Sequence, residues 1–380
     1  EKMASDDYQQ ENPVAYGLNY EARCMTSRVG ERDAHQFIVG THSLREKNEI
    51  HVIEYKEETE NVECLGVYSH PYGEIWQLQS CSSDKDLIST VYTDAKQGWK
   101  CNVWKLGQGP VGGGEEGGEM EADHMDQLLG LESVVELSGH EGPISTLRWS
   151  IVEEGEEGSP ESIVTLDSAC IRRWSLEGGK FDQKHCEKSP EIPGLTTGCF
   201  DPHHEQKFIV ASQSNILSWD FRSNKSAESI SAAHRGRILD IDYNPNRPYH
   251  IVSGGEDMVS RFWDLRNTKL PLNQLGGHTH WVSNIRFNRF HDQLLLSSGT
   301  DSNVNLWSIV SVSSAPVGEL EGGSASEKEG DKLIKRYEGH RDSVYSIAWS
   351  SDAWVFASLS FDGTVVINNV PQSEKYKILL

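Results

Sequence analysis

The sequence lacks any apolar run of the roughly 18 residues that a membrane-spanning helix needs. Its first residues, EKMASDDYQQEN, are polar and acidic rather than basic and then apolar, so we expect neither a secretory signal nor a membrane anchor. Basic residues are also scarce, because 35 Lys and Arg stand against 58 Asp and Glu, and the formal net charge is −23. An average surface of that sign repels phosphate backbones, so we expect no direct nucleic-acid binding.

The short motifs of many catalytic and metal centres are missing as well. We find no H-E-x-x-H, C-x-x-C, G-x-x-x-x-G-K-[ST] or G-x-S-x-G and no kinase-type glycine loop. His203-His204 and His278-Thr279-His280 have no carboxylate or thiol companion at ligand spacing. We therefore expect no enzymatic activity, no cofactor and no metal. The seven cysteines are odd in number and scattered, which is typical of reduced thiols in a cytosolic compartment; they are Cys24, Cys64, Cys81, Cys101, Cys170, Cys186 and Cys199.

What the sequence does have is an internal repeat. Two copies carry His, Ser, Asp and Trp at spacings of 19, 4 and 6 positions: His234, Ser253, Asp257 and Trp263, and His278, Ser297, Asp301 and Trp307. A third copy has spacings of 18 and 4, in His340, Ser358 and Asp362, but Asn368 stands where its Trp should be. A period of about 40 to 45 residues, with Gly-His near one end and Trp-Asp at the other, is typical of propeller blades, and the chain resembles the WD40 family.

Each complete set is expected to form one hydrogen-bonded chain inside a blade. Asp257 would accept from His234 and from turn amides, His234 from the Ser253 hydroxyl, and Ser253 from the Trp263 indole, so that no buried polar atom lacks a partner. A His, Ser and Asp set also permits a hydrolase interpretation. Repetition at identical spacing favours the structural role, because a hydrolase needs a single triad with an exposed nucleophile.

The spacing of apolar segments predicts an all-β, seven-bladed WD40 propeller over residues 13–380. Two early turns lack the aligned Asp and have Ser168 and Gln213 in its place. The C-terminal segment Lys375–Leu380 is expected to be the outer strand that closes the ring, since an exposed sheet edge would otherwise remain. The predicted first strands lie at Tyr16–Arg23, Glu74–Gln79, Pro143–Trp149, Thr196–Phe200, Arg237–Tyr243, Trp281–Phe287 and Ser343–Trp349.

Acidic, glycine-rich insertions interrupt the propeller. They are Gly107–Gln127, EEGEEGSPES beginning at Glu153, and Gly318–Asp331. Such segments bury too little apolar surface to offset chain entropy, so we expect them to be mobile, and residues 1–12 to form a disordered tail. The insertions serve either as solvated loops or as an attraction for a basic partner.

Function is expected on the face where the loops that enter the first strands meet those that join the second and third strands. Aromatic residues and arginine dominate binding hot spots, although each aromatic here could instead pack between strands or blades. The position in the repeat assigns seven residues to this face: Trp76, Arg237, Glu256, Trp281, Thr300, Tyr345 and Phe361.

A closer resemblance rests on particular segments. These are SVYSIAWSSDAWVFASLSFDGTVVINNV, KYKILL, GEIW, SHPYG, FNRFHDQL, SIVSVSSAPVG and YGLNYEARC. They are similar to the EARP and GARP complex-interacting protein family, from about Tyr16 to the last residue, whereas the runs at Gly107–Gln127 and Glu153–Gly158 are unlike it. The resemblance implies a non-catalytic WD40 adaptor that associates with the endosome-associated recycling and Golgi-associated retrograde tethering complexes. It would be cytosolic, monomeric in isolation and recruited through its partners to trans-Golgi and endosomal membranes.

A second interpretation comes from a different class of protein. Both Trp219-Asp220-Phe221-Arg222 and Trp263-Asp264-Leu265-Arg266 match W-D-x-R, which resembles the motif of substrate receptors of the cullin-4 ubiquitin ligase. Arg222 and Arg266 would then contact the ligase adaptor. Alternatively, each arginine caps its own turn or pairs across blades.

Overall fold

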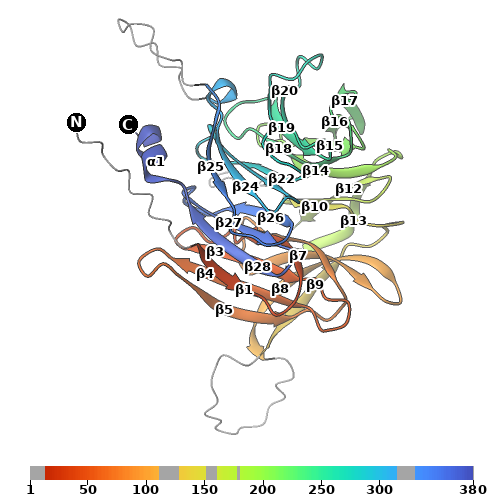
Figure 1. The fold of residues 1–380 in the computed structure, drawn as a ribbon. Helices are drawn as coiled ribbons and strands as arrows, with labels where there is room; N and C mark the ends of the chain where they lie inside the picture. The colour runs from red at the N-terminus through yellow and green to blue at the C-terminus, as the bar shows by residue number, and fades with distance from the viewer. Residues whose placement is uncertain (1–12, 111–127, 151–160, 178–179, 315–329, 380) are drawn as a thin grey trace, which may run out of the picture.

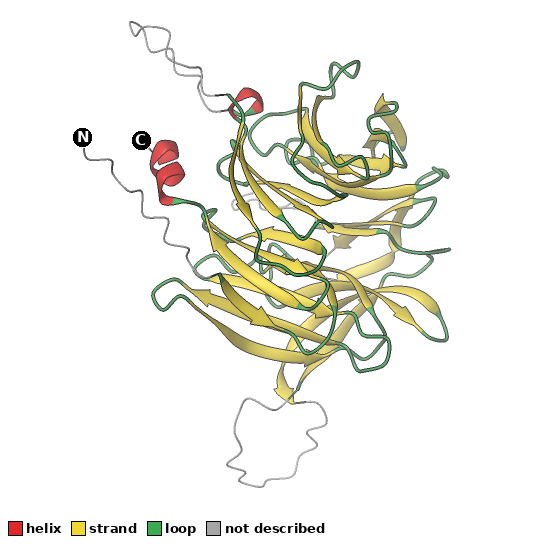
Figure 2. Cartoon of the chain, viewed as in Figure 1, coloured by secondary structure: helices red, strands yellow, loops and turns green. Residues whose placement is uncertain are grey.

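The chain folds into antiparallel sheets arranged side by side, as Figure 1 shows. The structure is a computed structural model and describes residues 13–110, 128–150, 161–177, 180–314 and 330–379. These residues form five four-stranded sheets and one eight-stranded sheet. Helix in the same residues is confined to α1 (Gln372–Leu379) and the short 3-10 turn η1 (Val310–Val312), drawn red in Figure 2. No helix in this part of the chain has the length and apolarity needed to span a membrane.

The strands follow one another in an up-and-down order within each run of four. The eight-stranded sheet has the order β2-β3-β4-β5-β9-β8-β7-β6, and comprises β2 (Ala22–Ser27), β3 (His35–Thr41), β4 (Glu49–Lys56), β5 (Asn61–Ser69), β6 (Ile75–Ser80), β7 (Leu87–Asp94), β8 (Gly98–Pro110) and β9 (Leu129–Glu136). The next three sheets along the chain are β10 (Thr146–Trp149), β11 (Ser162–Leu166), β12 (Ile171–Glu177) and β13 (Lys180–Lys188); β14 (Leu195–Phe200), β15 (Lys207–Ser212), β16 (Asn215–Asp220) and β17 (Lys225–Ile230); and β18 (Ile238–Tyr243), β19 (His250–Gly255), β20 (Ser260–Asp264) and β21 (Asn273–Leu275).

Two further sheets complete the architecture. They are β22 (Val282–Phe287), β23 (Leu294–Gly299), β24 (Val304–Ser308) and β25 (Lys332–Tyr337), and the terminal sheet of β1 (Val14–Gly17), β28 (Thr364–Asn369), β27 (Val355–Ser360) and β26 (Val344–Trp349). The first strands contact one another in chain order, from β2 through β6, β10, β14, β18 and β22 to β26, and β26 contacts β2 again. The inner strands therefore form a closed ring.

The outer strand of the last sheet is β1, near the N-terminus, and not the C-terminal segment that the sequence predicted. β1 pairs with β28, from Val14 opposite Ile367 to Gly17 opposite Thr364, and Figure 1 shows red β1 beside blue β28. The prediction of an outer strand at Lys375–Leu380 is wrong, since residues 375–379 lie in α1 and residue 380 lies outside the described residues. β1 already occupies the edge of β28, and Pro371 begins a helical turn whose carbonyl accepts the amides of Glu374 and Lys375.

The hydrophobic core lies between adjacent sheets rather than in one central mass. Second strands are almost wholly buried; β23 (LLLSSG) and β27 (VFASLS) have no exposed position, as expected for aliphatic strands covered on both faces. One buried cluster joins Phe37 and Ile53 of β3 and β4 to Ala357 and Val365 of the terminal sheet. The first and last sheets around the ring are therefore held together by apolar packing.

The eight-stranded sheet differs from the separate sets of strands that the sequence predicted. Its two runs of four, β2–β5 and β6–β9, meet where the outer strands β5 and β9 pair in parallel at Tyr68 and Leu129. The structure thus has six sheets rather than seven separate ones.

The predicted insertions fall largely outside the described residues, because 111–127, 151–160 and 315–329 are not described, and the predicted tail 1–12 lies outside them as well. Two parts of the insertions lie within the described residues. Residues 107–110 belong to β8, whose Pro110 pairs with Leu129 of β9, and Asp331 accepts the amide of Ser311 at 2.8 Å. Gly107, the first residue of one predicted insertion, therefore lies in β8, and Asp331, the last residue of another, has a hydrogen-bond partner.

Candidate partner-binding face

The two complete sets of repeat residues form hydrogen-bonded relays. His234 Nδ1 lies 2.8 Å from Asp257 Oδ1 and Nε2 lies 2.7 Å from Ser253 Oγ, which accepts from Trp263 Nε1 at 3.1 Å. In the next sheet the corresponding distances are 3.1 Å, 2.9 Å and 2.9 Å, in His278, Asp301, Ser297 and Trp307. Both serines are fully buried. A buried, hydrogen-bonded hydroxyl is the opposite of an exposed nucleophile, so neither serine has the environment that a hydrolase needs.

The third set is incomplete in the structure. His340 Nε2 lies 2.7 Å from Ser358 Oγ, but Asp362 instead accepts from the Ser360 hydroxyl and from the amide of Thr364. His340 Nδ1 is buried and has no hydrogen-bond partner among the described residues, and the same holds for the Asn368 side-chain nitrogen. The missing Trp and a displaced Asp leave this relay with a single bond.

Two further relays escaped the sequence analysis because Thr replaces Ser in them. Thr165 Oγ1 lies 2.8 Å from His140 Nε2 and accepts from Trp174 Nε1 at 3.0 Å. Thr90 does the same with His70 and Trp104, at 3.2 Å and 2.8 Å. Their His-to-Thr spacings are 25 and 20 and their Thr-to-Trp spacings are 9 and 14, so inserted residues hide the repeat.

The turn that lacks an aligned Asp at Ser168 uses the preceding residue. Asp167 accepts the amides of Ala169 and Cys170 at 3.0 Å and 2.7 Å and pairs with the buried guanidinium of Arg172. A search for this blade must allow Thr for Ser, a shift of one residue for Asp and a longer interval between His and Thr.

Burial and hydrogen bonding set the protonation of the relays. Burial raises the pKa of the Asp257 carboxyl, but hydrogen bonds from His234, Arg261 and the amide of Arg235 lower it by more, and the net pKa is well below its usual value. The pKa of Asp301 is likewise lowered, because bonds from His278 and the amide of Thr279 outweigh burial. Burial lowers the pKa of each of three relay histidines to about 4; they are His70, His140 and His340.

The residues assigned to the partner face fall into two groups. The first group lies around β18 and β22. The exposed Arg237 pairs with Glu256 at 2.7 Å, and the exposed Trp281 accepts at its carbonyl from the Thr300 amide at 3.0 Å. These side chains are available at the surface, although Arg237 already has a carboxylate partner.

The second group is a compact cluster that the sequence assigned only in part. Tyr345 and Phe361 meet edge-to-face at 5.9 Å, and the Arg23 guanidinium carbon lies 4.4 Å from the centre of the Tyr345 ring and 5.1 Å from that of Trp76. His42 packs edge-on against Trp76 at 4.5 Å and faces Phe361 at 6.4 Å. We call Arg23, His42, Trp76, Tyr345 and Phe361 the Arg23 cluster. Sequence analysis missed Arg23 because no WD40 motif residue occupies that position.

Backbone irregularity explains why these side chains meet. The register of β2 against β3 shifts between Ala22 and Cys24, so Arg23 is the extra residue of a bulge. The equivalent shifts in β6 and β26 leave Trp76 and Tyr345 as the extra residues. A bulge redirects the side chain of its extra residue. Three consecutive inner strands thus direct Tyr, Arg and Trp toward the same mouth of the ring.

The ring encloses a charged channel. A cavity of about 300 Å³ is lined by Arg23 and Tyr345 and, deeper, by Arg148, Asp240 and Arg286. Asp240 pairs with both of these deeper arginines, at 3.5 Å from Arg148. Burial raises the pKa of Asp242 in the same wall to about 6, against the influence of Arg286. At the far ends of the inner strands, a second cavity of about 670 Å³ opens beside the exposed Phe290.

The two arginines of the W-D-x-R motifs bind their own motif aspartates. Arg222 donates to Asp220 at 2.8 Å and Arg266 to Asp264 at 2.8 Å, and the Arg266 guanidinium also lies 5.3 Å from the Tyr249 ring centre. Their side chains remain 69% and 60% exposed. Both therefore cap their turns while still reaching solvent.

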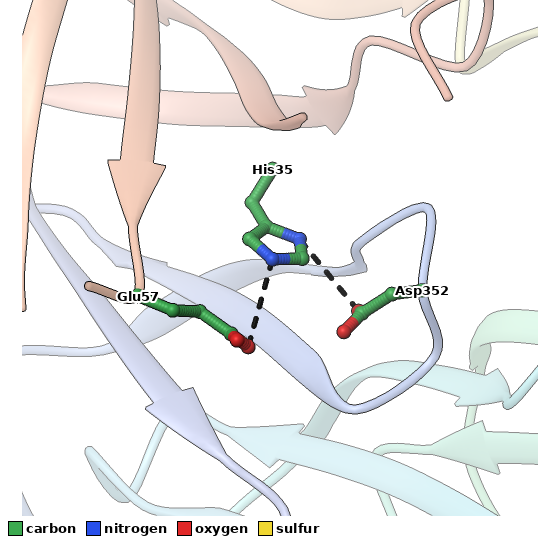
Figure 3. A group of neighbouring side chains, drawn as sticks. All are labelled: His35, Glu57 and Asp352. Carbon is green, nitrogen blue, oxygen red and sulfur yellow. Dashed lines mark ion pairs between the residues drawn. The ribbon is translucent and has the colours of Figure 1, made fainter. Parts of the chain in front are cut away.

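One group has the composition of a metal site. Figure 3 shows His35 with Glu57 at Nε2, 3.6 Å away, and Asp352 at Nδ1, 3.7 Å away. One metal ion binds only one nitrogen of an imidazole, and Nδ1 is already 2.7 Å from Ser350 Oγ. His35 therefore links β3 to the turn after β4, through Glu57, and to the turn from β26 to β27, through Asp352.

The paired histidines outside this group do have partners. His204 Nδ1 lies 2.9 Å from Asp201, so the expectation that it lacks a nearby carboxylate is wrong. His203 Nε2 lies 3.0 Å from the Asn244 carbonyl oxygen, and His278 belongs to its relay. None of these contacts brings His203 and His204 onto a common ligand centre.

Comparison with known proteins gives concordant matches. Residues 10–307 match the family described as EIPR1 beta-propeller, and residues 331–368 match the WD domain, G-beta repeat. Proteins named EARP and GARP complex-interacting protein 1 from Rattus norvegicus and Homo sapiens are each 36% identical, over 97% of this chain and 99% of their own. WD repeat-containing protein DWA2 from Arabidopsis thaliana is 35% identical, over 94% of this chain and 96% of its own.

With a family match across most of the chain and relatives that align along nearly its entire length, this all-β WD40 protein belongs to the EIPR1 beta-propeller family.

Proposed function

We propose that the protein is a non-catalytic adaptor that binds the EARP and GARP vesicle-tethering complexes in endosomal recycling and endosome-to-Golgi retrograde transport. The observation that carries the proposal is the 36% identity, over 97% of this chain, to relatives named as interactors of those two complexes. The arrangement of the inner strands supports it, because a closed ring with an aromatic and charged mouth is a rigid platform for a protein partner.

The proposal includes the architecture and location of the adaptor. We count β2–β5 and β6–β9 as two blades that share an edge, so that seven blades surround the channel. The protein would act in the cytoplasm and reach trans-Golgi and endosomal membranes through its partners. The acidic insertions at 107–127 and 318–331 would remain flexible and solvated.

Affinity purification of the tagged chain from cells, followed by mass spectrometry, tests the proposal. Tethering-complex subunits should co-purify with the wild-type chain. The matched control is Asp257→Ala, which disrupts a relay rather than a surface and should reduce capture only in proportion to the loss of folded protein. Recovery of cullin-4 components without any tethering subunit would reject the proposal.

The second candidate remains a substrate receptor of a cullin-4 ubiquitin ligase. It is favoured by the exposure of Arg222 and Arg266 at equivalent positions after their motif aspartates. Replacing both with Ala should abolish binding of the ligase adaptor and leave the thermal unfolding of the chain unchanged. Unaltered binding by the double variant would remove this candidate.

A further inference from the structure

Many of the described arginines have a carboxylate partner, whereas none is found for Arg23 among the described residues. Eight of them lie within ion-pair distance of a carboxylate: Arg28, Arg148, Arg172, Arg222, Arg237, Arg261, Arg266 and Arg286. Among the described residues, Arg23 has ring contacts but neither an ion pair nor a side-chain hydrogen bond. In a chain with 58 acidic residues against 35 basic ones, a guanidinium without an acidic partner at the mouth of the ring is a site with unused binding capacity.

The rings determine which part of the guanidinium is available. Tyr345 and Trp76 lie 4.4 Å and 5.1 Å from it and interact with the cation through their ring systems. The N–H groups of a guanidinium point outward in its plane, in a fork that matches the two oxygens of a carboxylate. A ligand that enters from the channel mouth would therefore bring a planar anion to the edge of Arg23.

The neighbouring charges limit how acidic the ligand can be. Burial lowers the pKa of His42, so this ring adds no positive charge at neutral pH, while Glu74 and Glu21 act on it as nearby negative charges. A doubly charged phosphate or a run of acidic residues would be repelled by these glutamates. A single carboxylate is attracted by Arg23 and meets less repulsion from these glutamates than a doubly charged group does.

We propose that the Arg23 cluster binds one Asp or Glu side chain of a short segment of a tethering-complex subunit, with an apolar neighbour of that residue packed on Phe361 and Trp76. This inference rests on the proposed function and names the surface that performs it. Aromatic and arginine anchors in a partly enclosed cavity are typical binding hot spots. The cavity of about 300 Å³ that Arg23 and Tyr345 line leaves room for the side chain.

The first experiment compares variants of the full-length chain for capture of the purified tethering complexes. Arg23→Met keeps an apolar stem between the rings but removes the charge, and should weaken binding at least about tenfold. Arg23→Lys keeps the charge but loses the forked pair of N–H donors. Its affinity should lie between those of the wild type and Arg23→Met. The matched control is Arg266→Met, because Arg266 also lies over an aromatic ring but already has a carboxylate partner; it should bind like wild type.

The outcomes separate the two proposals. If the wild-type chain captures no tethering complex, the proposed function fails and this inference fails with it. If the wild type binds and Arg23→Met binds equally well, the adaptor function stands and the inference is overturned. Trp76→Leu removes a ring that also packs against Trp99. Its binding is therefore compared with that of Arg23→Met only if the two variants have the same melting temperature.

The second experiment identifies the ligand group. Overlapping 15-residue peptides from the tethering subunits are tested by fluorescence polarisation, and each binding peptide is remade with Asn or Gln for its acidic residue. This exchange should weaken peptide binding to the wild-type protein at least about tenfold and should hardly change binding to Arg23→Met, since the two changes remove the same contact. Equal losses in both proteins, or binding that requires a phosphorylated peptide, would overturn the carboxylate assignment.

Discussion

At the scale of single residues, the relays show which part of the motif is essential. A hydroxyl that is hydrogen-bonded to both an imidazole and an indole recurs in four of the runs of four strands. It belongs to Ser253 and Ser297 in two of them and to Thr90 and Thr165 in the other two. The Asp is more variable, because it bonds the histidine in two cases, whereas Asp362 bonds its local turn and Asp167 bonds its local turn and Arg172. The hydroxyl links two buried donors or acceptors, whereas the Asp can be replaced by other turn partners.

This difference predicts unequal effects of the same substitution. Asp257→Ala removes the partner of buried His234 and of Arg261, so the free energy of unfolding should fall by about 3 kcal/mol. Asp362→Ala, at the equivalent repeat position, breaks no bond to His340 and should cost no more than about 1 kcal/mol. Urea unfolding followed by tryptophan fluorescence measures both. Equal losses would contradict the view that the third relay lacks its Asp.

The lowered histidine pKa values predict acid sensitivity above the range of carboxyl titration. The pKa of His340 is about 4 in the folded chain because of burial, against about 6.5 in an unfolded one. Between these values the unfolded chain binds the proton and the folded chain does not, so stability falls as pH drops through this window. His340→Gln should flatten the dependence of unfolding free energy on pH by up to about 1.4 kcal/mol per pH unit. The exposed His280→Gln is the control, and an equal flattening there would contradict the assignment to burial.

At the scale of elements, the strands were more predictable than their connections. The predicted first strands overlap β6, β10, β14, β18, β22 and β26, because aliphatic runs between turns are a strong signal. The sequence predicts an outer strand at Lys375–Leu380, but residues 375–379 lie in α1, which has no buried residue. Its sequence fits either structure, and the pairing of β1 with β28 decides the outcome. That pairing joins the two ends of the chain, which local patterns do not specify.

The closing strand should therefore matter more than the terminal helix. A chain that begins at Leu18 lacks β1 and leaves the edge of β28 unpaired, so its melting temperature should fall by on the order of 5 °C and it should aggregate more readily. A chain that ends at Pro371 lacks α1 but keeps every strand, and should melt within about 2 °C of the full chain. Differential scanning calorimetry distinguishes the two. A larger loss from the C-terminal truncation would contradict closure by β1.

At the scale of the whole molecule, the sequence predicted the all-β WD40 fold, but it did not identify Arg23 at the centre of the candidate site. The composition alone excluded few fold classes. The repeat of His, Ser, Asp and Trp predicted the fold. The Arg23 cluster depends on bulges in β2, β6 and β26 and on contacts between the two ends of the chain. Neither has a sequence signature in a single chain, so Trp76, Tyr345 and Phe361 could be assigned to a face while Arg23 could not.

The whole surface also bears on self-association, and we predict a monomer. Outer strands are short or charged: β21 has three residues, β17 exposes Lys225, and β25 exposes Lys335 beside the apolar Leu333. Charged edges disfavour strand pairing between molecules, and a net charge of −23 adds repulsion at low salt. Sedimentation velocity at about 10 μM should give the mass of one chain, and a concentration-dependent dimer of the wild type would contradict this. Lys335→Val should create an apolar edge and promote association, which tests whether that lysine protects β25.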